Sequence, residues 1–124
     1  MGMLSKLLRR NDSDAVLGEM EQAAIVCLKL GDEEIGSAQE REAISVLRDR
    51  LIRAVGQRDV GEFDTLEFDD GFGTLSFVGP NADRITEVIL PVVRTYAARS
   101  GSYVVKRYGE PGAREQSIVL GAHA

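Results

Sequence analysis

The clearest strand signal in this chain lies in residues 102–109, which have the sequence Ser-Tyr-Val-Val-Lys-Arg-Tyr-Gly. β-Branched and aromatic residues dominate the run, and the Glu-Pro-Gly that follows is typical of a turn. Because side chains alternate along a strand, Lys106 and Arg107 are predicted on opposite faces. Tyr103 shares the face of Arg107, and Tyr108 shares that of Lys106. At most one of the two cations can therefore serve a site on the open face of a sheet.

A helix is predicted before this strand, beginning at Asn81 as its N-cap and ending near residues 100–101. Its apolar positions recur at helical spacing, namely Ile85, Val88, Ile89, Val92, Val93 and Tyr96. Pro91 lies inside this pattern. Because proline lacks an amide donor and clashes with the preceding turn, we predict a kink over residues 87–91. After the strand, the Pro-Gly turn leads to a final short strand over residues 116–120.

The N-terminal half of the chain predicts a strand followed by a helix. The apolar run 23–30 has the length and β-branching of a buried strand. Ser37 and Glu40 match a capping box, so a helix is expected from there to Gly56. Its buried stripe consists of Ile44, Leu47, Leu51 and Val55.

A hairpin is predicted next, with strands over residues 61–69 and 73–78. The Asp-Gly pair between the two strands is a strong signal for a tight turn. Phe63 and Phe68 are out of phase for one face of the first strand, so we expect a bulge near residues 65–66.

The predicted elements follow the order βαββαβ, with an added C-terminal strand. Split βαβ units in this order predict a ferredoxin-like α+β sandwich, in which an antiparallel sheet carries both helices on one face. Residues 1–21 are expected to form a separate N-terminal arm, helical or partly disordered, and residues 22–124 a single domain. The other sheet face is left open for pairing or binding.

Composition limits the classes of partner. The chain has 15 basic and 20 acidic residues and a net charge of −5, which disfavours nucleic acid because a phosphate backbone attracts basic surfaces. It shows no signal-peptide pattern and no apolar run of the roughly 20 residues that cross a membrane. Cys27 is its only cysteine and is expected in the core, so no intramolecular disulfide can form. We therefore expect a cytoplasmic protein without membrane contact.

The sequence offers little for catalysis. The only histidine, His123, lies beside the C-terminal residue, so a nucleophilic triad lacks its base. No catalytic residue and no cofactor motif are identified. The hairpin carboxylates Asp64, Glu67 and Asp69 are candidate ligands for Mg²⁺ or Mn²⁺. The competing interpretation is a solvated face whose charges protect a sheet edge.

The strand over residues 102–109 offers chemistry for binding. Its candidate residues, with the arginine that follows through the turn, are Tyr103, Lys106, Arg107, Tyr108 and Arg114. A guanidinium group is a planar fork that anchors a carboxylate or phosphate. The alternative interpretation is that these long side chains only extend to water.

Three segments of the sequence, at residues 60–64, 77–83 and 101–113, resemble segments of known proteins. In them the chain resembles a group of small, uncharacterised bacterial proteins that have the same arrangement in about the same order. The most specific phrase is Ser-Tyr-Val-Val-Lys-Arg-Tyr-Gly-Glu-Pro-Gly-Ala. The likeness covers about residues 25–120 and implies no activity, cofactor or catalytic residue. Where the group has a glycine-rich hairpin, this chain departs from it over residues 65–71.

Taken together, these features favour a non-enzymatic binding or regulatory domain that acts through the open sheet face or a sheet edge. Its partner would be another protein or a second copy in a homodimer, and an acidic surface steers basic partners toward it. Two alternatives stay open. One is a carboxylate- or divalent-metal-dependent enzyme on a small anionic substrate, and the other is a sensor that binds a small anion between the sheet and the second helix.

Overall fold

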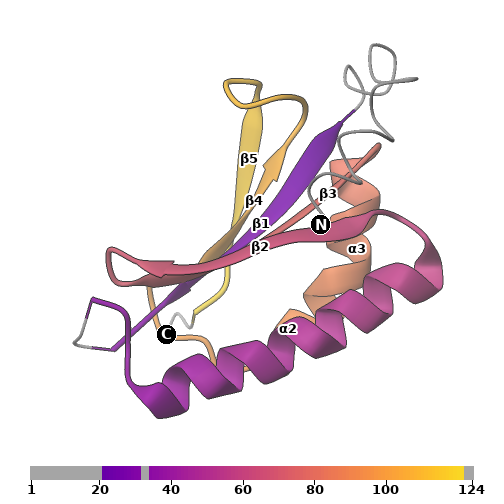
Figure 1. Cartoon of the computed structure of the whole chain (residues 1–124). Coiled ribbons are helices and arrows are strands. Elements are labelled where there is room, and N and C mark those ends of the chain that lie inside the picture. Colours follow the sequence, from indigo (N-terminus) through magenta and orange to yellow (C-terminus); the bar gives the residue numbers. More distant parts are fainter. Residues whose placement is uncertain (1–20, 32–33, 122–124) are drawn as a thin grey trace.

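A computed structural model describes residues 21–31 and 34–121. The predicted N-terminal arm and His123 lie outside these residues, apart from Glu21. The described elements are β1 (Gln22–Lys29), α2 (Ala38–Arg58), β2 (Glu62–Asp69), β3 (Phe72–Gly79), α3 (Ala82–Val93), β4 (Tyr103–Arg107) and β5 (Glu115–Val119) (Figure 1). Among them, neither helix is long and apolar enough to span a bilayer.

The strands form one sheet in the order β2-β3-β1-β4-β5, and every neighbouring pair is antiparallel. The long central strand β1 pairs with β3 on one side and with β4 on the other. The predicted α+β class, the antiparallel sheet and the final strand beside β4 are therefore confirmed. The two edges of the sheet are β2 and β5.

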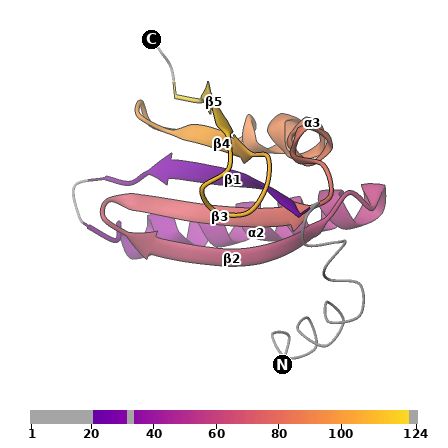
Figure 2. The ribbon, with the colours of Figure 1, turned by 90° about the horizontal axis from the view of Figure 1, so that it is seen from above.

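Both described helices pack on the same face of the sheet, as predicted. Ile44 of α2 places its Cδ1 atom 3.0 Å from where a Cβ atom on Gly73 would stand. Ile85 of α3 places its Cδ1 atom 3.1 Å from where a Cβ atom on Gly79 would stand. Gly73 and Gly79 are six residues apart on β3, so both positions lie on the same face of the sheet. Figure 2 shows α2 behind β2 and β3, and α3 beside the β4 side of the sheet. The helices thus share one core with the sheet and leave β5 largely uncovered.

That core contains the predicted stripes of both helices. Its fully buried residues include Leu28, Ile44, Leu51, Val55, Leu75, Phe77, Ile85, Ile89 and Val104. Burial of an aliphatic side chain stabilises a fold by roughly 1.5–3 kcal/mol, so these positions hold the helices on the sheet.

The beginning of α2 confirms the predicted N-cap at Ser37. The Ser37 Oγ atom accepts a hydrogen bond from the Glu40 N–H at 3.0 Å. The Glu40 carboxylate accepts hydrogen bonds from Gly31 N–H and Arg99 Nε, at 3.1 and 3.0 Å, and the Ser37 backbone contributes a further, weaker one. Burial alone would raise the pKa of Glu40, but these hydrogen bonds outweigh it and lower the pKa. Glu40 therefore joins α2 to two distant loops.

Both helices end elsewhere than predicted. Helix α2 continues past Gly56 to Arg58, and its C-cap Asp59 takes the left-handed conformation with φ 53°. Helix α3 ends at Val93 and not near residue 100, and Thr95 and Tyr96 continue with tighter bonds to the carbonyls three residues back. Pro91 thus lies in the last helical turn, where it cannot donate the usual hydrogen bond to the Glu87 carbonyl.

The hairpin between β2 and β3 is confirmed, with a bulge one residue earlier than predicted. Asp70 and Gly71 both have positive φ, 53° and 81°, as the tight turn requires. The register shifts between Phe63 and Thr65, which turns Phe63 toward the helices. The Phe63 ring packs edge-on against Phe77, with centroids 5.5 Å apart.

Candidate functional site

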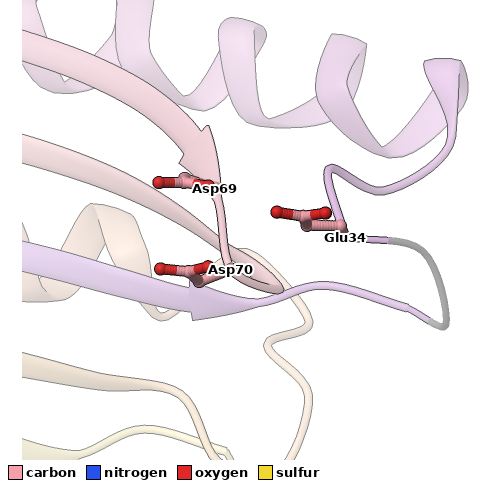
Figure 3. Close-up of side chains that lie close together, drawn as sticks. All are labelled: Glu34, Asp69 and Asp70. Atoms are coloured by element: carbon pink, nitrogen blue, oxygen red, sulfur yellow. The ribbon is translucent and has the colours of Figure 1, made fainter.

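The three carboxylates predicted as metal ligands do not form one cluster. Among the described residues, the acidic group that comes together is Glu34, Asp69 and Asp70, with one oxygen of each lying within 4.8 Å of the others (Figure 3). A backbone bond from Gly71 N–H to the Glu34 carbonyl, at 2.8 Å, holds the hairpin turn against the loop before α2. Of these three residues only Asp69 is among the predicted ligands; Asp70 in the turn and Glu34, which lies far from the hairpin in sequence, are not. All three residues of the cluster are exposed.

The sheet separates the five predicted binding residues into two groups. Lys106 and Tyr108 lie on the helix side, and Arg114 stacks on the Tyr108 ring with its Cζ atom 4.2 Å from the centroid. Tyr103 and Arg107 lie on the open face, opposite Val119 and Glu115 of β5. The prediction that the two cations point to opposite faces is confirmed, so no single site uses both.

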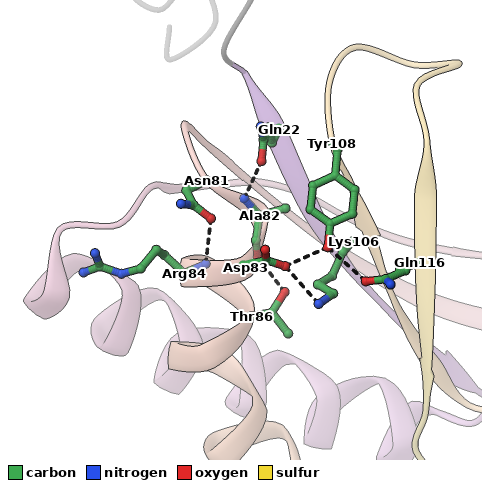
Figure 4. A network of polar contacts seen from close by, with 9 residues as sticks. All are labelled: Gln22, Asn81, Ala82, Asp83, Arg84, Thr86, Lys106, Tyr108 and Gln116. Atoms are coloured by element: carbon green, nitrogen blue, oxygen red, sulfur yellow. Dashed lines mark hydrogen bonds and ion pairs between the residues drawn. The ribbon is translucent and has the colours of Figure 1, made fainter.

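A polar network joins β4 and β5 to the first turn of α3 (Figure 4). The Asp83 Oδ1 atom accepts a hydrogen bond from the Tyr108 hydroxyl at 2.7 Å and lies 2.9 Å from Lys106 Nζ. The Tyr108 hydroxyl also lies 3.0 Å from the side-chain amide of Gln116. Because a hydroxyl carries one proton, Asp83 and the Gln116 Oε1 atom are alternative acceptors for it, and the carboxylate is the stronger acceptor of the two.

The polar network favours the charged forms of both Asp83 and Lys106. Hydrogen bonds from Tyr108 and Lys106 lower the pKa of Asp83, and the hydrogen bond to Asp83 raises the pKa of Lys106. Asp83 also lies at the positive end of the α3 dipole. The Lys106 ammonium is therefore ion-paired with Asp83 and is not free to bind an anion.

A cleft of about 390 Å³ opens beside this network, between α3 and the β4–β5 side of the sheet. It is lined by Asp83, Thr86, Glu87, Leu90, Lys106, Tyr108, Gln116 and Ile118. On α3, the residues Asp83, Glu87 and Leu90 form one stripe at helical spacing. Within residues 21–31 and 34–121, Glu87 makes no ion pair. Its carboxylate is thus the uncompensated charge of the cleft.

The open face carries an aromatic group near one end. The Phe72 and Tyr103 rings pack edge-on with centroids 6.0 Å apart, and Lys29 Nζ lies 5.4 Å from the Phe72 centroid. Cys27 lies on this face between Thr74 and Tyr103 and not in the core between sheet and helices, although it is buried as predicted. Burial raises the pKa of its thiol, which makes Cys27 a poor nucleophile.

The outer edge of β5 presents backbone groups that β4 does not use. The bonds from Tyr108 N–H to Arg114 O and from Leu120 N–H to Ser102 O, both 2.9 Å, continue the β4–β5 register at its two ends. Because hydrogen-bonded pairs alternate in an antiparallel ladder, the N–H and C=O groups at positions 115, 117 and 119 point away from β4. The sheet order leaves these groups unpaired by any described strand.

Comparison of the chain with protein-family models, with curated proteins and with solved structures found no match. The candidate site therefore rests on geometry alone. The sequence analysis missed Glu87 and Gln116, because neither belongs to a motif. The sequence predicts Asp83 in the first turn of a helix, but the spacing of its residues gives no sign that this turn lies beside Lys106.

Proposed function

We propose that this protein is a non-enzymatic binding domain, and that the β5 edge accepts an extended segment of a protein partner as an added strand. The supporting observation is the outward row of backbone groups at positions 115, 117 and 119. An exposed edge of this kind is a template for pairing with another chain, and many peptide-binding domains use it.

The side chains of β5 do not protect this edge. Only one of its five residues is charged, and that residue, Glu115, lies opposite Arg107 of β4. The strand contains no proline or lysine, and Val119 is 74% exposed. Val119 adjoins Tyr103 on the open face, so an added strand would gain apolar contact there as well as backbone hydrogen bonds.

We also propose that the fold is a ferredoxin-like sandwich extended by β5. The chain order βαββαβ and the central position of β1 between β3 and β4 support this assignment. In such an arrangement the added fifth strand replaces β4 as the edge, so the binding edge lies outside the basic unit of the fold.

Proline at position 117 tests the proposed edge, because it removes an outward N–H group while the bonds from 116 and 118 to β4 remain. Ligands would be selected from a displayed library of short peptides against the wild-type protein. Selected peptides should bind Ser117→Pro at least about tenfold more weakly, whereas Ser117→Ala, which keeps the N–H, should bind normally.

Val119→Lys provides a second variant, because a lysine on an edge strand discourages pairing without changing the backbone. Circular dichroism and a thermal melt would verify that each variant is folded. Peptides that bind wild type, Ser117→Pro and Val119→Lys equally well, or a library that yields no binder, would refute the edge proposal.

A further inference from the structure

We infer that the strand accepted by β5 carries a basic side chain, and that this side chain enters the cleft between α3 and β5 to pair with Glu87. This inference rests on the proposed edge function and adds the chemistry of the partner. It is carried by the position of the cleft, its charge and its apolar lining.

The cleft lies directly below the proposed edge. Its β5 lining residues, Gln116 and Ile118, are the two residues of that strand that point to the helix side. Side chains directly opposite each other on paired strands have Cβ atoms about 4.5–5.5 Å apart. Every second side chain of an added strand would therefore lie beside Gln116 or Ile118, at the mouth of the cleft.

The charge of the lining favours a cation. Two carboxylates and one ammonium group line the cleft, and the ammonium of Lys106 is already bound by Asp83 at 2.9 Å. Glu87 lies one turn farther along α3, with no ion pair to any described residue. A small anion would face the Glu87 carboxylate without a free cation in the lining. The geometry thus does not favour the anion-sensor alternative for this cleft.

The apolar part of the lining fits the stem of a long basic side chain. Leu90 on α3 and Ile118 on β5 line the cleft from opposite sides. Lysine and arginine bury their methylene stems on apolar surface while the charged group stays near water or an acid. An aspartate or glutamate from the partner would instead repel Glu87.

On the other face, the same added strand would lie beside Ser117 and Val119, next to the row formed by Val105 and Tyr103. This row favours apolar side chains. The partner segment is therefore expected to alternate basic residues, facing the cleft, with apolar residues, facing the open side of the sheet.

Three short capped peptides test this inference on the full chain. They alternate valine with lysine, with glutamine or with glutamate. The lysine peptide should bind best, and Glu87→Gln should weaken it by roughly threefold to fivefold, the range of a partly exposed ion pair. Glu42→Gln, which makes the same change at an exposed position on α2, should leave the affinity unchanged.

The outcomes separate the inference from the function on which it rests. If the lysine and glutamine peptides bind equally and Glu87→Gln has no effect, yet Ser117→Pro abolishes binding, the edge function stands and the basic segment is refuted. If Ser117→Pro leaves the binding of every peptide unchanged, the edge function falls as well. A wild-type dimer that Ser117→Pro converts to monomer would identify a second copy as the occupant and overturn the inference, because Gln116 and Ile118 of that copy carry no charge.

Discussion

The two edges of the sheet are held in different ways. Strand β2 has eight residues and turns Phe63, Leu66 and Phe68 toward the helices, while four of its other five residues are acidic. Strand β5 has five residues, places Ile118 against the core and is tied to α3 through the polar network of Tyr108 and Gln116. The difference shows that β2 is an edge anchored by burial and guarded by charge. The β5 edge has Ile118 at the margin of the core and is paired with no further strand among the described residues.

The largest effect expected from this comparison is on stability. Phe63→Ala should lower the free energy of unfolding by about 2–3 kcal/mol, because it removes a large half-buried ring and its edge-on contact with Phe77. Ile118→Ala should cost about 1 kcal/mol, since its side chain lies at the margin of the core. Urea unfolding measures both values. Equal losses would contradict the view that β2 is the better anchored edge.

A second prediction tests whether the acidic side chains of β2 prevent this edge from pairing with another chain. In the double variant Glu67→Thr with Asp69→Thr, two of the acids that point to the open face are replaced by residues that favour strands. We expect concentration-dependent association, with a dissociation constant at least about tenfold below that of wild type. Sedimentation measures this, and a variant that stays as monomeric as wild type would show that the bulge alone protects the edge.

A third prediction concerns pH, because the polar network beside β5 contains the ion pair between Lys106 of β4 and Asp83 of α3. The pKa of Asp83 is lowered in the folded state, so its stabilisation is present above the ordinary carboxyl pKa and is lost as the pH falls through the folded value. The pKa of Lys106 is raised, so its share is complete below the ordinary ammonium pKa and is lost as the pH rises through the folded value. The network should therefore be intact between about pH 5 and pH 9.

Asp83→Asn tests this pH window. The variant should unfold at lower urea than wild type near neutral pH, and the two midpoints should converge in acid, where the wild-type carboxyl is also neutral. Tyr108→Phe is the matched control, because it removes one hydrogen bond to Asp83 but keeps the ring under Arg114. A difference between Asp83→Asn and wild type that stays constant from neutral to acid pH would contradict an ionic role for Asp83.

Local signals in the sequence predicted much of the fold. The period of two placed Lys106 and Arg107 on opposite faces, and the Asp70-Gly71 pair specified its turn without help from the rest of the chain. The contacts of the site are long-range. Asp83 meets Tyr108 across 25 positions, and Glu40 meets Arg99 across 59. Residue type and spacing cannot pair such groups, because only the packing of α3 beside β4 brings them together.

The smallest expected effect tests whether the acids near the β2 edge lower stability. Asp70→Asn should raise the free energy of unfolding by about 0.5 kcal/mol, because it relieves repulsion within Glu34, Asp69 and Asp70 and because asparagine accepts a positive φ. A double-mutant cycle with Glu34→Gln separates the two causes. If repulsion contributes, the gain from Asp70→Asn should be smaller in the Glu34→Gln background, and its size should fall as salt is added. An equal gain in both backgrounds would assign the whole effect to the backbone conformation of the turn, and the acids near β2 would then guard the edge at no cost in stability.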